Sequence, residues 1–571
     1  MLIVVWSSIL LLWLLCGVVL IGIGSLLLGP LASTSRLGDA FWAGLAAAVA
    51  VLEVYHFFRP IDSVIAVLFI GLGLAGFVFC RIVLLRQWKT FRTTAPWSLP
   101  MMLLVATLVA VRAAGPCEHY DTGLYGSSVV RWAATYPLVP GLANLHGRFG
   151  FNSSVFLCVA SFDQGILRGI SYHLFGGLLV LAFAAMIVPA CERLVRGSST
   201  SLADCFLFFL LIPTVSWIAR AEIVGTITDL PAAAALLVAC NYLLCGLEQK
   251  KQNPEECSST NLFIAMLTFA LAITFKLSMV VMGCLGMAIA FLAMAMPTPV
   301  QGKRTKLHYA SLIFSALILL PWIGRSLMLS GYPFYPNSAL SLPVDWRVPT
   351  ASANWDAAWV QSWARLPHAS LIETKGFGWL VPWWKNAWGN REGFMAPVLL
   401  SLTSGLILII QGFRLKLPNL SGGLWLLAIS SAGLVFWLIE APALRFGEGL
   451  LWANAAALAT CAIYSLPVHL REEGGITALT ISILLAVYCV YPRTLWIESY
   501  RKPLAVRSFV ALPKVAVTPE RTDTGLTIFV PVEGNQCWET NLLCTPDFNR
   551  TLRLRSTVGL PSGFHSENSP H

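Results

Sequence analysis

Apolar runs long enough to cross a lipid bilayer recur along the whole chain. A transmembrane helix needs about 20 consecutive apolar residues. Fourteen segments are close to that length: 3–28, 38–57, 62–84, 98–114, 169–191, 202–219, 229–247, 261–275, 278–296, 309–329, 394–412, 421–439, 448–467 and 474–492. The chain is 57% hydrophobic and only 12% charged, with a mean hydropathy of +0.72, whereas soluble domains are about one quarter charged. The sequence therefore predicts an all-α polytopic membrane protein with about fourteen spans.

The first apolar run, Leu2 to Leu28, is expected to remain in the protein as a membrane helix. It lacks a preceding basic segment and is longer than the apolar core of a secretion signal, which has about 7 to 15 residues. We divide the chain into N-terminal transmembrane helices (1–97), a transmembrane core (98–492) and a C-terminal tail (493–571).

Short basic loops predict the orientation of these spans. Their residues are Arg81, Arg86, Lys89 and Arg92; Arg193 and Arg196; Lys250 and Lys251; Lys303, Arg304 and Lys306; Arg414 and Lys416. All of these loops fall on one side under the span list, which the positive-inside rule assigns to the cytoplasm. Much of the net charge of +10 lies in such loops, so it reports topology and predicts no nucleic-acid partner. The sequence assigns no oligomeric state.

Three long segments then fall on the extracytoplasmic side: 116–154, 331–392 and the tail from Arg493. In the tail, residues 526–532 are typical of a strand and Gly534-Asn535 of a turn. Cys537 and Cys544 follow in a polar stretch, and in an exported tail they are expected to form a disulfide.

The segment 331–392 is rich in tryptophan. It contains Trp346, Trp355, Trp359, Trp363, Trp379, Trp383, Trp384 and Trp388. Trp355, Trp359 and Trp363 recur every fourth residue, which predicts one face of a short helix. We interpret this triplet as an amphipathic helix in the headgroup layer, and leave sugar or lipid contact open for Trp383 and Trp384.

Two aspartates are candidates for chemistry on the extracytoplasmic side. Asp121 follows a span directly, where a carboxylate can accept a proton from an acceptor hydroxyl as a general base; spacing alone favours an ordinary solvated loop aspartate. Asp229 lies where an outer turn enters a helix, two residues before Pro231, so helix capping explains it at least as well as catalysis. Lys276 lies in a tight hairpin, and its position alone favours an interfacial lysine.

Several motifs resemble known membrane proteins. Asp121-Thr122-Gly123-Leu124-Tyr125 in the first large outer loop resembles the loop aspartate of the GT-C superfamily of membrane glycosyltransferases, and Thr228-Asp229-Leu230-Pro231 is similar to a second motif of those enzymes. An uncharacterised bacterial family of polytopic membrane proteins is also similar in five segments: 121–125, 140–148, 330–336, 445–447, and 536–538 with 544–546. The usual GT-C layout has its catalytic loop after the first helix; here three additional spans precede the loop, and these would be an N-terminal addition.

The resemblance implies transfer of a sugar from a polyprenyl-phosphate donor to a cell-envelope acceptor, at the outer face of a bacterial inner membrane. It implies that Asp121 is the general base and that Asp229 is a second catalytic candidate. A phosphate leaving group needs cationic partners, and the predicted substrate-binding residues are Lys276, Arg325, Arg445, Tyr125, His146 and Arg148.

No cofactor is predicted, because the lipid-linked sugar is a substrate. Some relatives carry Asp-Glu where this chain has Asp121-Thr122, so no metal is assigned. The sequence has no P-loop or dinucleotide motif in a usable context, which argues against a nucleotide-driven transporter. Two alternatives remain: an envelope polysaccharide polymerase or ligase that relies on basic residues, and a transporter or lipid flippase without bond chemistry.

Overall fold

Long apolar helices make up most of the molecule. The computed structural model describes residues 2–29, 36–197, 201–252, 259–295, 304–412, 421–466, 500, 503–504, 506 and 508–567. Its α-helices are α1 (Leu2–Leu28), α2 (Leu37–Tyr55), α3 (Ser63–Thr94), α4 (Ser98–Ala113), α5 (Ser127–Thr135), α6 (Ser154–Phe162), α7 (Phe175–Val195), α8 (Leu202–Phe209), α9 (Leu211–Ala219), α10 (Asp229–Gln252), α11 (Ser259–Phe275), α12 (Val280–Ala295), α13 (Arg304–Ser330), α14 (Thr350–Arg365), α15 (Leu380–Gly389), α16 (Ala396–Gly412), α17 (Ser421–Glu440) and α18 (Leu444–Tyr464).

Eleven helical segments within these ranges are long and apolar enough to cross a membrane. Two further predicted spans correspond to shorter apolar helices, α4 with 16 residues and α11 with 17. The predicted span 474–492 lies outside the described residues. The protein is therefore a helical membrane protein, and the count of fourteen spans stays a prediction.

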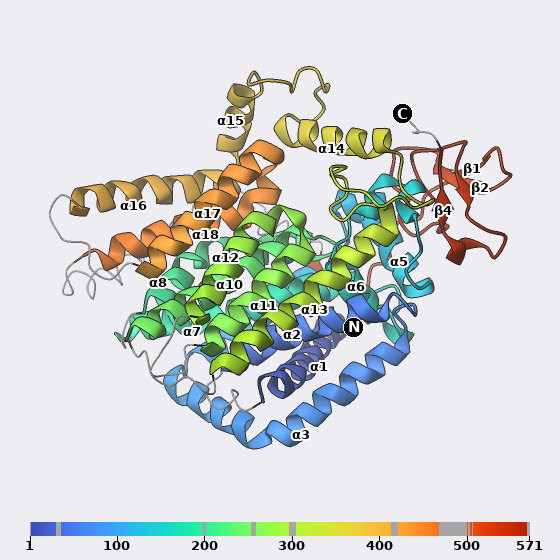
Figure 1. The fold of residues 1–571 in the computed structure, drawn as a ribbon. Coiled ribbons are helices and arrows are strands. Elements are labelled where there is room, and N and C mark those ends of the chain that lie inside the picture. The colour runs from blue at the N-terminus through green and yellow to red at the C-terminus, as the bar shows by residue number, and fades with distance from the viewer. Residues whose placement is uncertain are drawn as a thin grey trace.

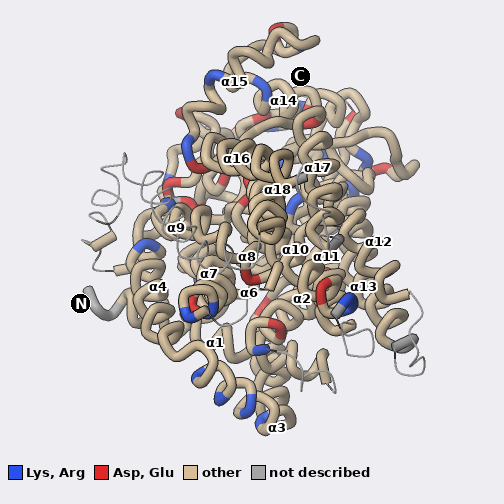
Figure 2. Tube along the Cα trace, turned by 90° about the vertical axis from the view of Figure 1, so that its left-hand side faces the viewer, with Lys and Arg blue, Asp and Glu red and all other residues tan. Residues whose placement is uncertain are grey.

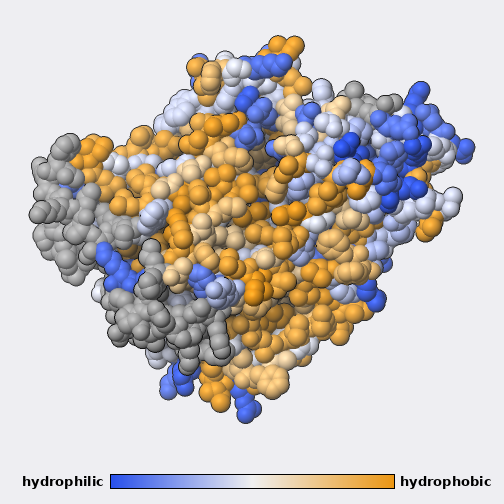
Figure 3. Space-filling model, in the orientation of Figure 1, coloured by the Kyte–Doolittle hydropathy of each residue, from blue (hydrophilic) through white to orange (hydrophobic). Residues whose placement is uncertain are grey.

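The long helices pack side by side around α10 and α11 (Figure 1). Nearly every side chain of these two helices is buried, and many are small, which lets neighbouring backbones approach closely. On the outside, α3, α13 and α16 expose large apolar side chains such as Phe79 and Ile82. Figure 3 shows a broad apolar surface across the middle of one face, and Figure 2 shows charged positions at several heights of the molecule, among them a row of basic residues along α3. An apolar surface of this breadth suits a lipid environment.

One end of the helical layer gathers three segments that are distant in the sequence. We call it the loop end; it is formed by residues 116–154, 331–392 and 508–567, at the top and upper right of Figure 1. Its short elements are the π-helix η2 (Thr122–Gly126), the 3₁₀ turns η3 (Leu142–Asn144) and η4 (Gly147–Gly150), the pair β1 (Val517–Arg521) and β2 (Thr527–Pro531), and the pair β3 (Arg553–Leu554) and β4 (Phe564–His565). The predicted strand at 526–532 corresponds to β2.

The C-terminal appendage, residues 508–567, shares a hydrophobic core with the first outer loop. Trp132, Leu142 and Phe149 of the loop pack in one buried cluster with Ile528 and Phe564 of the appendage. The backbone N–H of Phe564 also donates to the carbonyl of Pro140 at 3.0 Å. The appendage is therefore built onto the loop and not held by its linker alone.

One short buried helix was not expected from the sequence. α6 follows the first outer loop and turns back into the helical layer, where the hydroxyl of Ser154 donates to Glu53 Oε1 at 2.5 Å. Its nine residues are too few to be found by a span-length criterion.

Candidate functional site

Four of the predicted site residues meet at the loop end, each placed by the end of a helical element. Asp121 directly precedes η2, and Asp229 is the first residue of α10. Lys276 follows α11, and Arg445 is the second residue of α18. We call Asp121, Asp229, Lys276 and Arg445 the charged group.

Two ion pairs and one aromatic ring connect this group. Arg445 Nη1 donates to Asp121 Oδ2 at 2.7 Å, and Lys276 Nζ donates to Asp229 Oδ1. The ring of Phe446 lies against both cations, with its centroid 3.8 Å from Lys276 Nζ and 5.1 Å from Arg445 Cζ. A cation over an aromatic face is attracted by the ring quadrupole. The two pairs therefore form one continuous arrangement.

The two pairs differ in depth. The Arg445 and Asp121 side chains are 35% and 21% exposed, whereas those of Lys276 and Asp229 are 17% and 8% exposed. The outer pair is therefore open to a ligand, and the inner pair lies beneath it as a buried partner. Asp229 lies in the first turn of its helix, as the sequence predicts, and its carboxylate pairs with Lys276. Because of this buried ion pair, Lys276 is not the interfacial lysine that its position alone suggested.

Burial and charge act in opposite directions on the ionisation of the group. Burial acts to raise the pKa of Asp121, but Arg445 and, more weakly, His119 and Arg148 outweigh it and hold that pKa below its ordinary value. Burial lowers the pKa of Lys276, and Asp229 only partly offsets this effect. Asp121 is thus a carboxylate at neutral pH, and as long as Arg445 is bound to it, it is a weak base.

His119 is a neighbour of the group that sequence reasoning missed. Burial lowers the pKa of its imidazole despite the opposing charges of Asp121 and Asp229. Its Nδ1 lies 3.5 Å from the hydroxyl of Thr122. Histidine can carry protons at neutral pH, so its position two residues before Asp121 was the signal available in the sequence.

The helix α14 covers the loop side of the site with the predicted tryptophan triplet. The prediction of a helix here is confirmed. The guanidinium of Arg148 lies 4.7 Å from the ring centroid of Trp359, and that of Arg445 lies 5.1 Å from the ring centroid of Trp363. Two rings of the triplet therefore contact two of the predicted substrate-binding arginines. The interpretation of this helix as a headgroup-layer helix did not predict these contacts.

Tyr125, His146 and Arg325 are placed differently from one another. The Tyr125 ring is packed against Phe156, and burial and, more weakly, the charge of Asp121 raise the pKa of its hydroxyl. His146 is buried, with Nδ1 3.2 Å from a carboxylate oxygen of Asp547 in the appendage. Tyr125 thus borders the charged group, whereas His146 joins the loop to the appendage.

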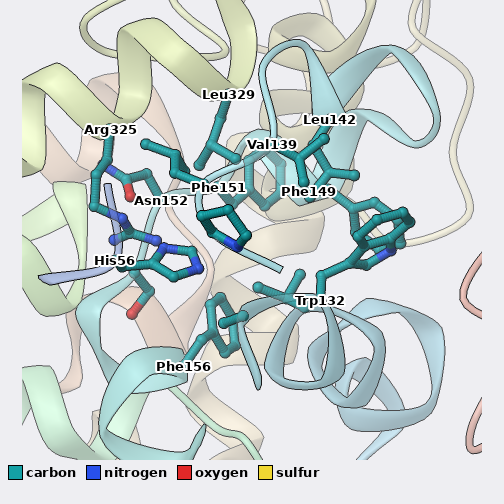
Figure 4. Close-up of a pocket in the computed structure, with 15 residues that line it drawn as sticks. His56, Trp132, Val139, Leu142, Phe149, Phe151, Asn152, Phe156, Arg325 and Leu329 are labelled. Atoms are coloured by element: carbon teal, nitrogen blue, oxygen red, sulfur yellow. The ribbon is translucent and has the colours of Figure 1, made fainter. Parts of the chain in front are cut away.

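Arg325 does not join the charged group. Its Nη1 donates to Glu53 Oε2 at 2.9 Å, and both side chains are almost fully buried. Arg325, His56 and Asn152 form the polar side of a small pocket whose other side is aromatic and aliphatic (Figure 4). This pocket is adjacent to Tyr125, because Phe156 both contacts Tyr125 and lines the pocket. Arg325 therefore acts here as the partner of Glu53.

Trp383 is a core residue of α15. Its indole N–H donates to the carbonyl of Pro442 at 2.8 Å, and its ring packs edge-on against Trp437. Trp384 is half exposed and stacks on Trp388. Of this pair, only Trp384 remains accessible to a ligand.

A second charged cluster lies near the first and was also missed. Arg220 Nη1 and Nη2 donate to the two oxygens of Glu448 at 2.8 Å each, and Arg220 also lies 3.4 Å from Glu392 and 3.7 Å from Glu222. The fork of a guanidinium matches a carboxylate in this bidentate way. The cluster ties the end of α9 to the start of α18.

The structure holds the predicted disulfide pair in contact. Cys537 and Cys544 are bonded, with their Cα atoms 5.9 Å apart. Within the described ranges, no group of three His, Cys, Asp or Glu residues is arranged to hold a metal ion.

A family model covers most of the chain. The model described as a domain of unknown function, DUF8201, matches residues 2–452. The chain belongs to the DUF8201 family. The match includes all four residues of the charged group and the three N-terminal helices, while the appendage follows it. No curated protein and no solved structure matches the chain.

Proposed function

We propose that this DUF8201 protein is a membrane glycosyltransferase of GT-C type. It would move a sugar from a polyprenyl-phosphate donor to a cell-envelope acceptor at the outer face of a bacterial inner membrane. The observation that carries the proposal is the charged group: a partly exposed Arg445–Asp121 pair joined through Phe446 to a more deeply buried Lys276–Asp229 pair. Ionisable residues at membrane depth are functional-site hypotheses by default, and Asp229, Lys276 and Arg445 lie at the ends of long apolar helices.

The roles follow from the balance of the reaction. The acceptor hydroxyl forms a bond to the anomeric carbon while the bond from that carbon to the phosphate oxygen breaks. Asp121 takes the hydroxyl proton, and the polyprenyl phosphate leaves with the bonding electrons. Arg445 and Lys276 stabilise the negative charge that grows on the phosphate. The N-termini of α10 and α18 add positive potential at the same place.

The direct pairing of Asp121 with Arg445 gives the site a resting state. A guanidinium binds phosphate as well as carboxylate, so a donor phosphate competes with Asp121 for Arg445. When Arg445 turns to the phosphate, its lowering effect on the pKa of Asp121 weakens and the carboxylate becomes a better base. Donor binding would thus prepare the base for the acceptor.

The two alternatives make different use of the same residues. A polymerase or ligase that relies on basic residues does not need the carboxylate of Asp121. A transporter or flippase moves the lipid without releasing the phosphate. The presence of a carboxylate and a cation in one site favours transfer with a base. The reaction needs a base for the acceptor hydroxyl and a cation for the leaving phosphate.

The test uses full-length protein in liposomes. A panel of polyprenyl-phosphate hexoses and pentoses is offered with an envelope extract as acceptor, and released polyprenyl phosphate is measured by mass spectrometry. We expect Asp121→Asn to lower the rate by about 100-fold or more, because it keeps the shape and removes the basicity. Asp523→Asn, at an exposed position of the appendage, is the matched control and should retain the wild-type rate.

Full release by Asp121→Asn would overturn its role as base and favour the polymerase or ligase. Movement of a labelled lipid across the membrane without release of phosphate would favour the transporter. Arg445→Gln should weaken donor binding as well as the rate, since Arg445 contacts the leaving group from the start.

A further inference from the structure

The disulfide-closed loop of the appendage lies directly on the turn that carries Asp121. The backbone N–H of Trp538 donates to the carbonyl of Gly123 at 2.9 Å, and the hydroxyl of Ser127 donates to the carbonyl of Trp538 at 3.2 Å. Gln536 Nε2 donates to the carbonyl of Tyr120 at 2.8 Å. These bonds hold the backbone on both sides of Asp121.

The indole of Trp538 fills the space that a side chain at residue 123 would occupy. A Cβ atom added to Gly123 would lie 2.4 Å from Cε2 of this ring, well inside contact distance. Trp538 itself is buried and has a φ of 45°, a left-handed conformation that residues other than glycine rarely adopt. Trp538 follows Cys537 directly, so this residue lies inside the disulfide-closed loop.

A second face of η2 is held by the turn that leads to Asp229. The backbone N–H of Thr226 donates to Thr122 Oγ1 at 3.0 Å, and the two threonine hydroxyls lie 3.3 Å apart. A Cβ at Gly126 would lie 1.9 Å from Thr226 Oγ1. The π-helix is therefore contacted on two faces, by Trp538 and by the Thr226 turn, with Asp121 directly before its start.

We propose that the loop Cys537–Cys544 is a clamp on the Asp121 turn, with Trp538 as its positioning residue. This rests on the proposed function only in so far as Asp121 is the base. A π-helix is rare and is frequent at functional sites, so we infer that these contacts on two of its faces select it. Displacing a catalytic group by about 1 Å can lower the rate by about 100-fold. Release of the clamp would displace Asp121 in this way.

The substitution that tests the contact is Gly123→Ala. Alanine is favoured over glycine in a helix. A loss of order in the turn is therefore attributed to the Trp538 ring, whose atoms are the nearest to the added Cβ. The control is Gly378→Ala, at a loop-end glycine with no atom within 4 Å of its added Cβ. Trp538→Ala removes the ring, Trp538→Phe keeps an aromatic at that position, and a Gly123→Ala/Trp538→Ala double variant removes the clash.

Full-length variants in detergent are compared by hydrogen exchange of the peptide covering residues 118–127. We expect exchange faster by about tenfold or more in Gly123→Ala and in Trp538→Ala, with partial recovery in Trp538→Phe. In the double variant Gly123→Ala should add nothing to Trp538→Ala, because the ring that it meets is absent. Wild-type exchange in Trp538→Ala would overturn the clamp, as would additive effects in the double variant.

The transfer assay adds the second readout. Variants that loosen the turn should lower kcat with little change in KM, whereas Gly378→Ala should change neither. Faster exchange with an unchanged kcat would overturn the positioning role of Trp538. If wild-type protein transfers no sugar, the proposed function fails, and the exchange measurement still decides whether the clamp exists.

Discussion

The ion pair between Lys276 and Asp229 shows how residue roles depend on contacts that sequence spacing does not reveal. Spacing alone suggested a helix cap for Asp229 and an interfacial position for Lys276. In the structure, the start of α10 and the end of α11 lie side by side, so the two charges meet in a buried place. Removing one partner of a buried pair leaves the other charge without compensation.

Asp229→Asn should therefore cost about 3 kcal/mol of stability, the range for a broken buried pair. A cap role alone would predict almost no cost, because asparagine caps about as well as aspartate. The thermal midpoint of the purified protein measures the difference. The matched control is Glu567→Gln, which breaks the exposed pair between Arg553 and Glu567; exposed pairs contribute about 0–1 kcal/mol.

A second variant separates the pair from a loss of folding. Asp229→Asn combined with Lys276→Met removes both charges and should recover most of the stability, since a neutral pair of similar volume is tolerated in place of a buried ion pair. Equal midpoints for Asp229→Asn and Glu567→Gln would show that the inner pair contributes nothing beyond an exposed one.

At the scale of elements, the three N-terminal helices touch through glycines. A Cβ at Gly76 of α3 would lie 2.0 Å from the carbonyl oxygen of Gly22 in α1, and a Cβ at Gly24 would lie 1.8 Å from the carbonyl oxygen of Ala40 in α2. Small residues at helix crossings let backbones approach closely inside a membrane. The same helix α3 carries Gly71, which has nothing within 4 Å of its added Cβ.

These two glycines give a matched pair of substitutions. Gly76→Ala should lower the stability by about 1–3 kcal/mol, the usual cost of overpacking, because α1 and α3 must move apart. Gly71→Ala should be neutral or slightly stabilising, because alanine is the better helix former. Thermal midpoints in detergent compare the two. An equal response would mean that the close approach of α1 and α3 is unimportant for stability.

The same contrast explains what could be predicted from the sequence. Each span is a local property of its own residues, so most long helices, the helix of the tryptophan triplet and the strand β2 were found. The contact between Gly123 and Trp538 joins residues more than 400 positions apart, and α6 is too short for a span criterion. From the sequence, Arg325 and Arg445 have the same predicted role as phosphate-binding cations. Only the packing of α2 beside α13 shows that Arg325 pairs with Glu53.

At the scale of the whole molecule, the three long segments meet at one end of the helices. The clamp, the shared core with Phe564 and the pair between Arg555 and Asp345, whose Nε and Oδ2 lie 2.7 Å apart, all join the appendage to the outer segments. Segments that pack together must lie on the same side of a membrane. The topology expected from the basic loops has this property, because it assigns all three to the extracytoplasmic side.

Cysteine labelling in intact bacterial cells tests that topology. Val558 in the appendage is 80% exposed, and Thr94 lies exposed at the end of α3, next to the basic residues. Val558→Cys should react with a membrane-impermeant maleimide, measured against the wild-type background of native cysteines, whereas Thr94→Cys should react only after the cells are opened. Labelling of Thr94→Cys but not of Val558→Cys in intact cells would show that the protein has the opposite orientation in the membrane. The charged group would then face the cytoplasm, where lipid-linked sugars of the outer face cannot reach Arg445, and the proposed transfer reaction would have to be abandoned.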